Sequence, residues 1–260
     1  MNDIRNVKLF IFCIVLLSLP IQHLYTQESI YPKGSPLWLV DMFFNQPSFP
    51  EKEKYYSGEM LQDVNYPTIG EEDFQSDSIS YRKIAASNQA EVYSITITKY
   101  YDSRYFYCYL FNDAGTWKID TIRKFQLPAF IHEVADSLAR TEQAPDTTLN
   151  LQRMLELMTS SDEKLKTYLS DNVNSFYTII NDFEYNRPIK LKSLMNQFGL
   201  ESIYYDDLYP GCIFIMIGKI DRFEIGYIFS PNKSALPGIT PQRFIYIEEI
   251  IPKWFVYRVM

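Results

Sequence analysis

Hydrophobic and polar residues alternate along two stretches of the chain, and each alternation predicts an antiparallel β-sheet. Residues 90–100 place apolar side chains on one side and hydroxyl side chains on the other, as in a strand buried on one face. The Asn-Asp-Ala-Gly segment at 112–115 has the chemistry of a hairpin turn. It separates two further alternating segments, 104–111 and 117–124. In the second stretch the alternating segments are 212–219, 223–229, 244–250 and 254–259.

Apolar residues recur every three or four positions in other parts of the chain, which predicts helices there. The first helix, at 35–45, has Ser35 as its cap and Pro36 at its first position. A second is predicted at 128–140, just after the first sheet. Ser160 and Glu163 have the spacing of a capping box at the start of a later helix. The helices predicted in the second half are 149–158, 161–181 and 189–198.

Both halves of the chain run from helices to a sheet, which predicts an α+β fold with helices followed by an antiparallel β-meander. The polar segment 141–148, which contains Pro145, interrupts both periodicities and is the predicted linker. It divides an N-terminal α+β domain at 27–141 from a C-terminal α+β domain at 149–260. One domain and a structural duplication both remain open alternatives.

The N-terminus has the pattern of a signal peptide. Arg5 and Lys8 precede an apolar run at 9–21, and a more polar stretch follows. A helix of this length spans roughly 20 Å, short of the ~30 Å hydrocarbon core of a bilayer. We therefore expect residues 1–26 to be removed and the protein to be exported to the periplasm, the cell surface or the extracellular space, with no stable membrane span after processing. An uncleaved signal anchor is the alternative.

The composition and net charge of the chain limit the classes of binding partner that we expect. The chain has 47% hydrophobic and 16% aromatic residues, enough for a substantial core, and its net charge is −7. Phosphate binding needs clustered Lys and Arg, so nucleic acid is not an expected partner. The remaining candidates are a glycan, a peptide or an envelope protein, and the sequence does not determine the oligomeric state.

The sequence also argues against several cofactor chemistries. Once residues 1–26 are removed, His132 is the only histidine, so we expect no catalytic zinc site and no metal. The glycines form neither GxGxxG nor a Walker loop, and we expect no other cofactor. Cys108 and Cys212 then remain, either as a disulfide between the halves or as buried free thiols.

Two segments resemble known proteins. The segment Gly115, Thr116, Trp117, Lys118, Ile119, Asp120 resembles the closing strands of NTF2-like cone domains, over about 35 residues. That resemblance implies a curved sheet wrapped around a helix, often with a pocket. The segment 212–260 is similar to the C-terminal meander of small exported bacterial proteins of unknown function, which implies a fold and no activity.

Two sets of residues are candidates for a site. Tyr105, Tyr107 and Tyr109 share one side of a predicted strand with Trp117 nearby, and such a stripe could stack on a sugar ring or a peptide. The alternative is that the stripe is covered and belongs to the core. The second set comprises the carboxylates Asp120, Asp221 and Glu224. Two of them in one enclosed cavity could act as acid and base, whereas solvation at strand edges is the structural alternative.

These patterns favour an exported, non-catalytic binding or interaction module that presents an aromatic sheet face to a glycan, peptide or envelope partner. An exported enzyme with a carboxylate or tyrosine acid-base pocket, NTF2-like or a glycan hydrolase, is the alternative. A purely structural envelope subunit is the third hypothesis.

Overall fold

The computed structural model describes residues 29–45, 51–62, 76–100, 102–140 and 146–260. By its contacts the chain divides into two compact units, Met1–Ile30 and Tyr31–Met260. All described helices and strands lie in the second unit, where they form two antiparallel sheets with helices, so the predicted α+β class is confirmed. The predicted signal peptide at 1–26 lies outside the described residues, as do residues 141–145 of the predicted linker.

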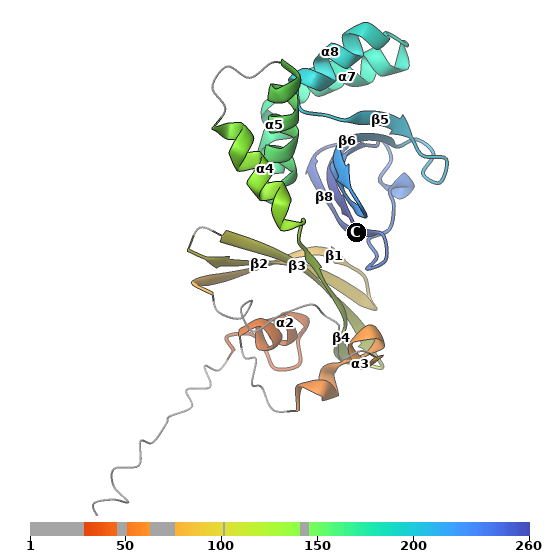
Figure 1. Cartoon of the computed structure of the whole chain (residues 1–260). Helices are drawn as coiled ribbons and strands as arrows, with labels where there is room; N and C mark the ends of the chain where they lie inside the picture. The colour runs from red at the N-terminus through yellow and green to blue at the C-terminus, as the bar shows by residue number, and fades with distance from the viewer. Residues whose placement is uncertain (1–28, 46–50, 63–75, 101, 141–145) are drawn as a thin grey trace, which may run out of the picture. The chain divides into compact units, whose positions relative to one another are not determined.

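The first sheet is a four-stranded meander of β1 (Ser78–Ala86), β2 (Ala90–Lys99), β3 (Asp102–Asp113) and β4 (Thr116–Phe125), in that order (Figure 1). Ala114 and Gly115 both have positive φ, 50° and 92°, as a two-residue hairpin between β3 and β4 requires. Asn112 Oδ1 accepts a hydrogen bond from Gly115 N at 2.8 Å. The predicted hairpin is thus confirmed.

One face of this sheet is covered by N-terminal elements: α2 (Pro36–Asn45), the short 3-10 helix η1 (Lys52–Tyr55) and α3 (Gly58–Gln62). Ser35 Oγ accepts from Trp38 N at 3.2 Å and caps α2, as the sequence predicts. Below α2 lies an apolar cluster to which β2, β3 and β4 contribute alternate residues, among them Ile95, Phe106 and Ile122.

In the described part of the chain five helices follow: α4 (Ala129–Ala139), α5 (Asp146–Met158), α6 (Asp162–Asp171), α7 (Val173–Glu184) and α8 (Pro188–Gln197). The single helix predicted at 161–181 is wrong, because Asn172 ends α6 and begins α7. Its side chain donates to Tyr168 O at 2.8 Å, and such a local bond competes with the helical backbone pattern. The predicted cap is shifted by one residue: Ser161 Oγ, not Ser160, accepts from Lys164 N at 3.1 Å.

The second sheet has the strand order β5-β6-β7-β9-β8. Its strands are β5 (Ser202–Tyr205), β6 (Ile213–Ile220), β7 (Phe223–Phe229), β8 (Phe244–Ile251) and β9 (Trp254–Val259). The predicted simple meander is wrong here, since β9 lies between β7 and β8, and β5 was not predicted. The loop between Phe229 and Phe244, which contains prolines, carries the chain from β7 to β8. The β8–β9 hairpin then places β9 between them, where it pairs with both.

The largest apolar cluster joins the second face of the first sheet to the helices and the second sheet. Trp254, Tyr227 and Phe176 lie at its centre, with the Phe176 ring 5.2 Å from Tyr227 and 5.8 Å from Trp254. Tyr227 donates to Leu165 O at 2.9 Å, which fixes α6 against the sheet. No helix within the described residues combines the length and the apolar character that crossing a bilayer requires.

Candidate functional site

The three predicted tyrosines lie on the face of β3 that packs against the C-terminal half, and each has a different environment. Tyr109 is buried and donates to Ile245 O at 2.9 Å. Tyr107 is fully buried, and its hydroxyl lies 3.4 Å from Asp162 Oδ2. Tyr105 is only partly buried. The structure therefore gives Tyr107 and Tyr109 the packed environment of the structural alternative and leaves Tyr105 accessible.

Beside Tyr107 lies a buried ion pair between the first residue of α6 and the end of β9. Arg258 Nε donates to Asp162 Oδ1 at 2.8 Å, and the two side chains are 1% and 4% exposed. Arg258 Nη2 also donates to Ser160 O at 2.9 Å. The ring of Phe125 lies 4.4 Å from the guanidinium carbon and that of Tyr105 5.6 Å. The guanidinium is thus held by two acceptors and two aromatic rings.

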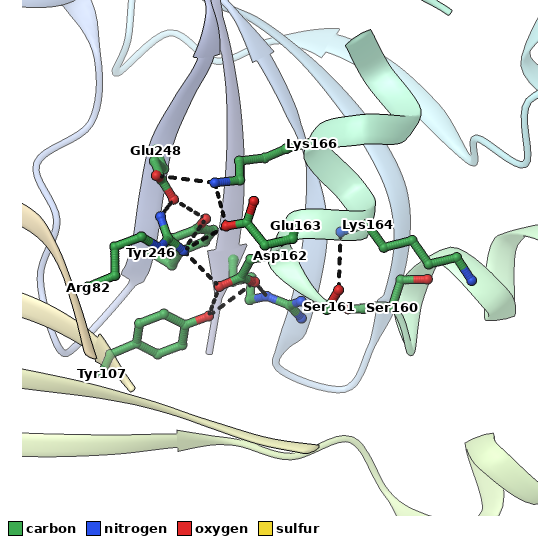
Figure 2. Close-up of polar contacts among 11 residues, drawn as sticks. Arg82, Tyr107, Ser160, Ser161, Asp162, Glu163, Lys164, Lys166, Tyr246 and Glu248 are labelled. Atoms are coloured by element: carbon green, nitrogen blue, oxygen red, sulfur yellow. Dashed lines mark hydrogen bonds and ion pairs between the residues drawn. The ribbon is translucent and has the colours of Figure 1, made fainter. Parts of the chain in front are cut away.

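A second group of charges lies beside Asp162 (Figure 2). Arg82, from β1, forms an ion pair with Glu248 of β8, and its Nη2 lies 3.8 Å from Asp162 Oδ2. Lys166 of α6 is 3.3 Å from the same Glu248 and 2.6 Å from Glu163. The charges alternate in sign, so the network links β1, α6 and β8 without a large net charge.

Burial controls the protonation of the aromatic hydroxyls around the pair. Burial first, and then Asp162, raises the pKa of Tyr107 well above its usual value. The pKa of Tyr246 is raised by the same two causes. Burial also raises the pKa of Tyr105, although Arg258 and hydrogen bonds with Ser103 and Ser161 act in the opposite direction. All three phenols are therefore neutral near pH 7 and serve as hydrogen-bonding groups rather than as bases.

Two cavities meet at Tyr105. The first, which we call the hydroxyl cavity, has a volume of about 240 Å³. Its lining includes Tyr105, the charged residues Arg82, Asp162 and Glu163, and five residues with hydroxyl side chains: Ser80, Ser94, Thr96, Ser103 and Ser161. Strand register explains the gathering, because Ser80 pairs with Thr96 and Thr96 with Tyr105, which places these side chains in one row across the sheet face.

The second cavity, which we call the basic cavity, has a volume of about 300 Å³. It is lined by apolar residues such as Phe125 and Met158, and Arg258 is a lining residue, but no Asp or Glu is. Arg104 and Lys124 also line it, but strand alternation directs their side chains to the opposite sheet face, where Lys124 Nζ lies 5.8 Å from the Phe106 ring. Arg258 is therefore the cation that faces this space.

The other predicted site residues are not brought together. Trp117 packs with the α2 cluster on the opposite face from Tyr105. Asp120 lies against α3 and accepts from Ser57 Oγ at 3.3 Å, and Asp221 is exposed in the β6–β7 turn. Glu224 accepts from Tyr257 at 2.7 Å and from Tyr204 at 3.0 Å. None of the three carboxylates lines the hydroxyl cavity or the basic cavity.

Histidine and cysteine have separate locations. His132 is exposed on α4 at the edge of the basic cavity. Cys108 and Cys212 are buried free thiols, which matches the second of the two alternatives for them. Burial raises the pKa of both thiols. Within the described residues, no group of His, Cys, Asp and Glu side chains could hold a metal ion.

Sequence reasoning did not find Asp162, Arg258 or Arg82. One usable signal was present for Arg258: Trp254 and Val256 alternate onto the core face of β9, and Arg258 continues that alternation. A charge on the buried face of a strand indicates a buried partner. Its partner, Asp162, is 96 residues away in the sequence and could not be identified without the fold.

In comparisons with known proteins, no family model, no curated protein and no solved structure matched this chain. The geometry of the site therefore carries the functional argument alone.

Proposed function

We propose that the protein is an exported, non-catalytic binding module that takes a glycan at Tyr105. The observation that carries the proposal is the hydroxyl cavity, where one accessible aromatic ring lies next to five hydroxyl side chains, an arginine and two carboxylates. Sugars present apolar ring faces together with many hydroxyl groups, and this combination matches an aromatic platform with surrounding donors and acceptors.

The size and the chemistry of the cavity favour a glycan over the peptide or envelope protein that the sequence also allows. Its volume of about 240 Å³ is slightly below the range of small-molecule sites, which run from about 300 to about 1,000 Å³, so it suits one sugar unit better than a protein surface. Binding rather than catalysis is favoured because Asp162 is held by Arg258 and Tyr107, and the nearby phenols remain protonated. The N-terminal segment 1–26 supports the export part of the proposal.

Isothermal titration calorimetry with a panel of mono- and disaccharides tests the binding. We expect Tyr105→Ala to weaken binding about tenfold, because it removes the stacking surface, and Tyr105→Phe to weaken it less. Tyr185→Ala is the matched control, since Tyr185, the residue that follows α7, is 69% exposed and lines neither cavity. Equal affinities of wild type and Tyr105→Ala, or no binding of any saccharide, would contradict the proposal.

Export needs its own test. We expect cell fractionation to recover the protein outside the cytoplasm in a form shortened by about 26 residues, as N-terminal sequencing would show. Full-length protein in the cytoplasm would refute this part of the proposal and leave glycan binding to be judged by calorimetry.

A further inference from the structure

Arg258, which lines the basic cavity, has one N–H donor group that is not hydrogen-bonded within the described residues. Arg258 is 1% exposed at its side chain, and its Nε and Nη2 donate to Asp162 and Ser160. In the described part of the chain, Nη1 has no acceptor. The fully buried side-chain atoms that lack a partner there are Asn150 Oδ1 and Trp254 Nε1, so Nη1 is not sealed in protein. It therefore reaches the basic cavity that Arg258 lines.

The ion pair gives the two cavities opposite electrostatic character. Asp162 lines only the hydroxyl cavity and Arg258 only the basic cavity. The pair is neutral overall, but its positive end faces the basic cavity, whose lining contains no Asp or Glu. The chain as a whole has a net charge of −7, so a cavity with this positive character is a local exception to its overall negative charge.

A helix end adds to the same field. Residues of the first turn of α4, Ala129 and His132, line the basic cavity. The helix has 11 residues, no acidic residue in its first turn and no side-chain cap. Ile131 N donates to Pro128 O, so the uncapped N–H groups at its start are those of Ala129 and Phe130. An anion in the basic cavity would meet both the free guanidinium N–H and the positive end of the helix.

Resting on the proposed glycan binding, we propose that the basic cavity is a carboxylate subsite and that the preferred ligand is an acidic saccharide. Its sugar ring lies in the hydroxyl cavity against Tyr105, and its carboxylate lies in the basic cavity and accepts from Arg258 Nη1. Ser103 and Tyr105 line both cavities, so one ligand can occupy them together.

The first test compares acidic ligands with matched neutral ligands on the wild-type protein. Glucuronate, galacturonate and mannuronate are each compared with their neutral methyl esters by calorimetry at pH 7 and low salt. At least one acid should bind roughly tenfold more tightly than its ester, the effect of one charge-assisted hydrogen bond. Added salt should reduce this preference by screening the charge.

A protein variant then locates the effect. Ala129→Asp places a negative charge in the exposed first turn of α4, where acidic residues favour helices, so the fold should tolerate it. We expect it to abolish the preference for the acid and to preserve binding of the ester. Asn174→Asp makes the same charge change in the exposed first turn of α7, away from both cavities, and should keep the preference.

The outcomes separate the two proposals. Esters that bind as well as or better than their acids overturn the carboxylate subsite and leave glycan binding intact. A preference that persists in Ala129→Asp also overturns it, because the acid would then bind elsewhere. If no acid or ester binds at all, the carboxylate subsite is wrong, and the saccharide panel with Tyr105→Ala decides the glycan proposal separately.

Discussion

Removing one member of the buried Asp162–Arg258 pair should destabilise the protein more than removing both. At 2.8 Å and an effective dielectric constant of about 20, the attraction between the two charges is about 6 kcal/mol. Removing both from water costs several kcal/mol per ion, which offsets much of that attraction. In Asp162→Asn, however, Arg258 stays charged and buried without its counter-ion. We expect this variant to lose about 3–5 kcal/mol of unfolding free energy.

The double variant Asp162→Asn/Arg258→Met leaves no unpaired charge in the core. Met fills a similar elongated volume, and Asn can still accept from Tyr107, so its loss should be about 1–2 kcal/mol. Urea unfolding followed by tryptophan fluorescence measures Asp162→Asn, Arg258→Met and the double variant. Arg243→Met is the control, because its pair with Asp206 is 46% exposed on the arginine side and should contribute less than about 1 kcal/mol. Additive losses in the double variant, or a loss below about 1 kcal/mol in Asp162→Asn, would refute the reasoning.

Three other predictions concern tyrosine ionisation, the thiols and one glycine. Burial and then Glu224 raise the pKa of Tyr204 to about 12, above an ordinary value of about 10. A tyrosine whose pKa is higher in the folded state than in the unfolded state contributes its full stabilisation at a pH below the unfolded pKa. This stabilisation is lost as the pH rises toward the folded pKa. The urea concentration at the unfolding midpoint should therefore decrease as pH is raised from about 10 to about 12, and it should decrease less steeply in Tyr204→Phe. An identical slope in both proteins would contradict this. In a Cys13→Ser chain, Ellman's reagent should label no thiol in the native protein and both Cys108 and Cys212 after unfolding, because both are free and buried; fast native labelling would oppose it. In Gly226→Ala the new methyl would lie 2.8 Å from the Tyr257 ring and against Ile215 O, which should cost about 1–3 kcal/mol. Gly238→Ala, which meets nothing within 4 Å, should be neutral in the same urea assay.

Local patterns were enough to predict most of the elements. The alternation along β2, β3 and β4 and the turn chemistry at Ala114 and Gly115 are encoded within a few residues, so they could be predicted from sequence. The split between α6 and α7 could not, because periodicity continues through Asn172 and only its side-chain bond to Tyr168 O shows the break. The placement of β9 between β7 and β8 depends on long-range pairing, which short patterns do not report.

The candidate site shows the same limit. The sequence identified the tyrosine row on β3 but could not show that the C-terminal half covers Tyr107 and Tyr109 and leaves Tyr105 accessible. These residues have equivalent positions in the period-two pattern, and only the packing of α6 and the second sheet distinguishes them. The NTF2-like resemblance and the two-domain division stay predictions.

The buried ion pair offers one further way to separate stability from recognition. A buried pair is often no more stabilising than apolar residues of similar volume, so stability alone does not explain charges at positions 162 and 258. If Arg258 serves the carboxylate subsite, the double variant Asp162→Asn/Arg258→Met should remain folded and still bind the methyl esters through Tyr105. It should show no preference for the acids, because the guanidinium that faces the basic cavity is gone. The comparison needs only calorimetry with the same acid and ester pairs, and circular dichroism to verify the fold. A folded double variant that still prefers the acids would show that the pair has no part in ligand recognition.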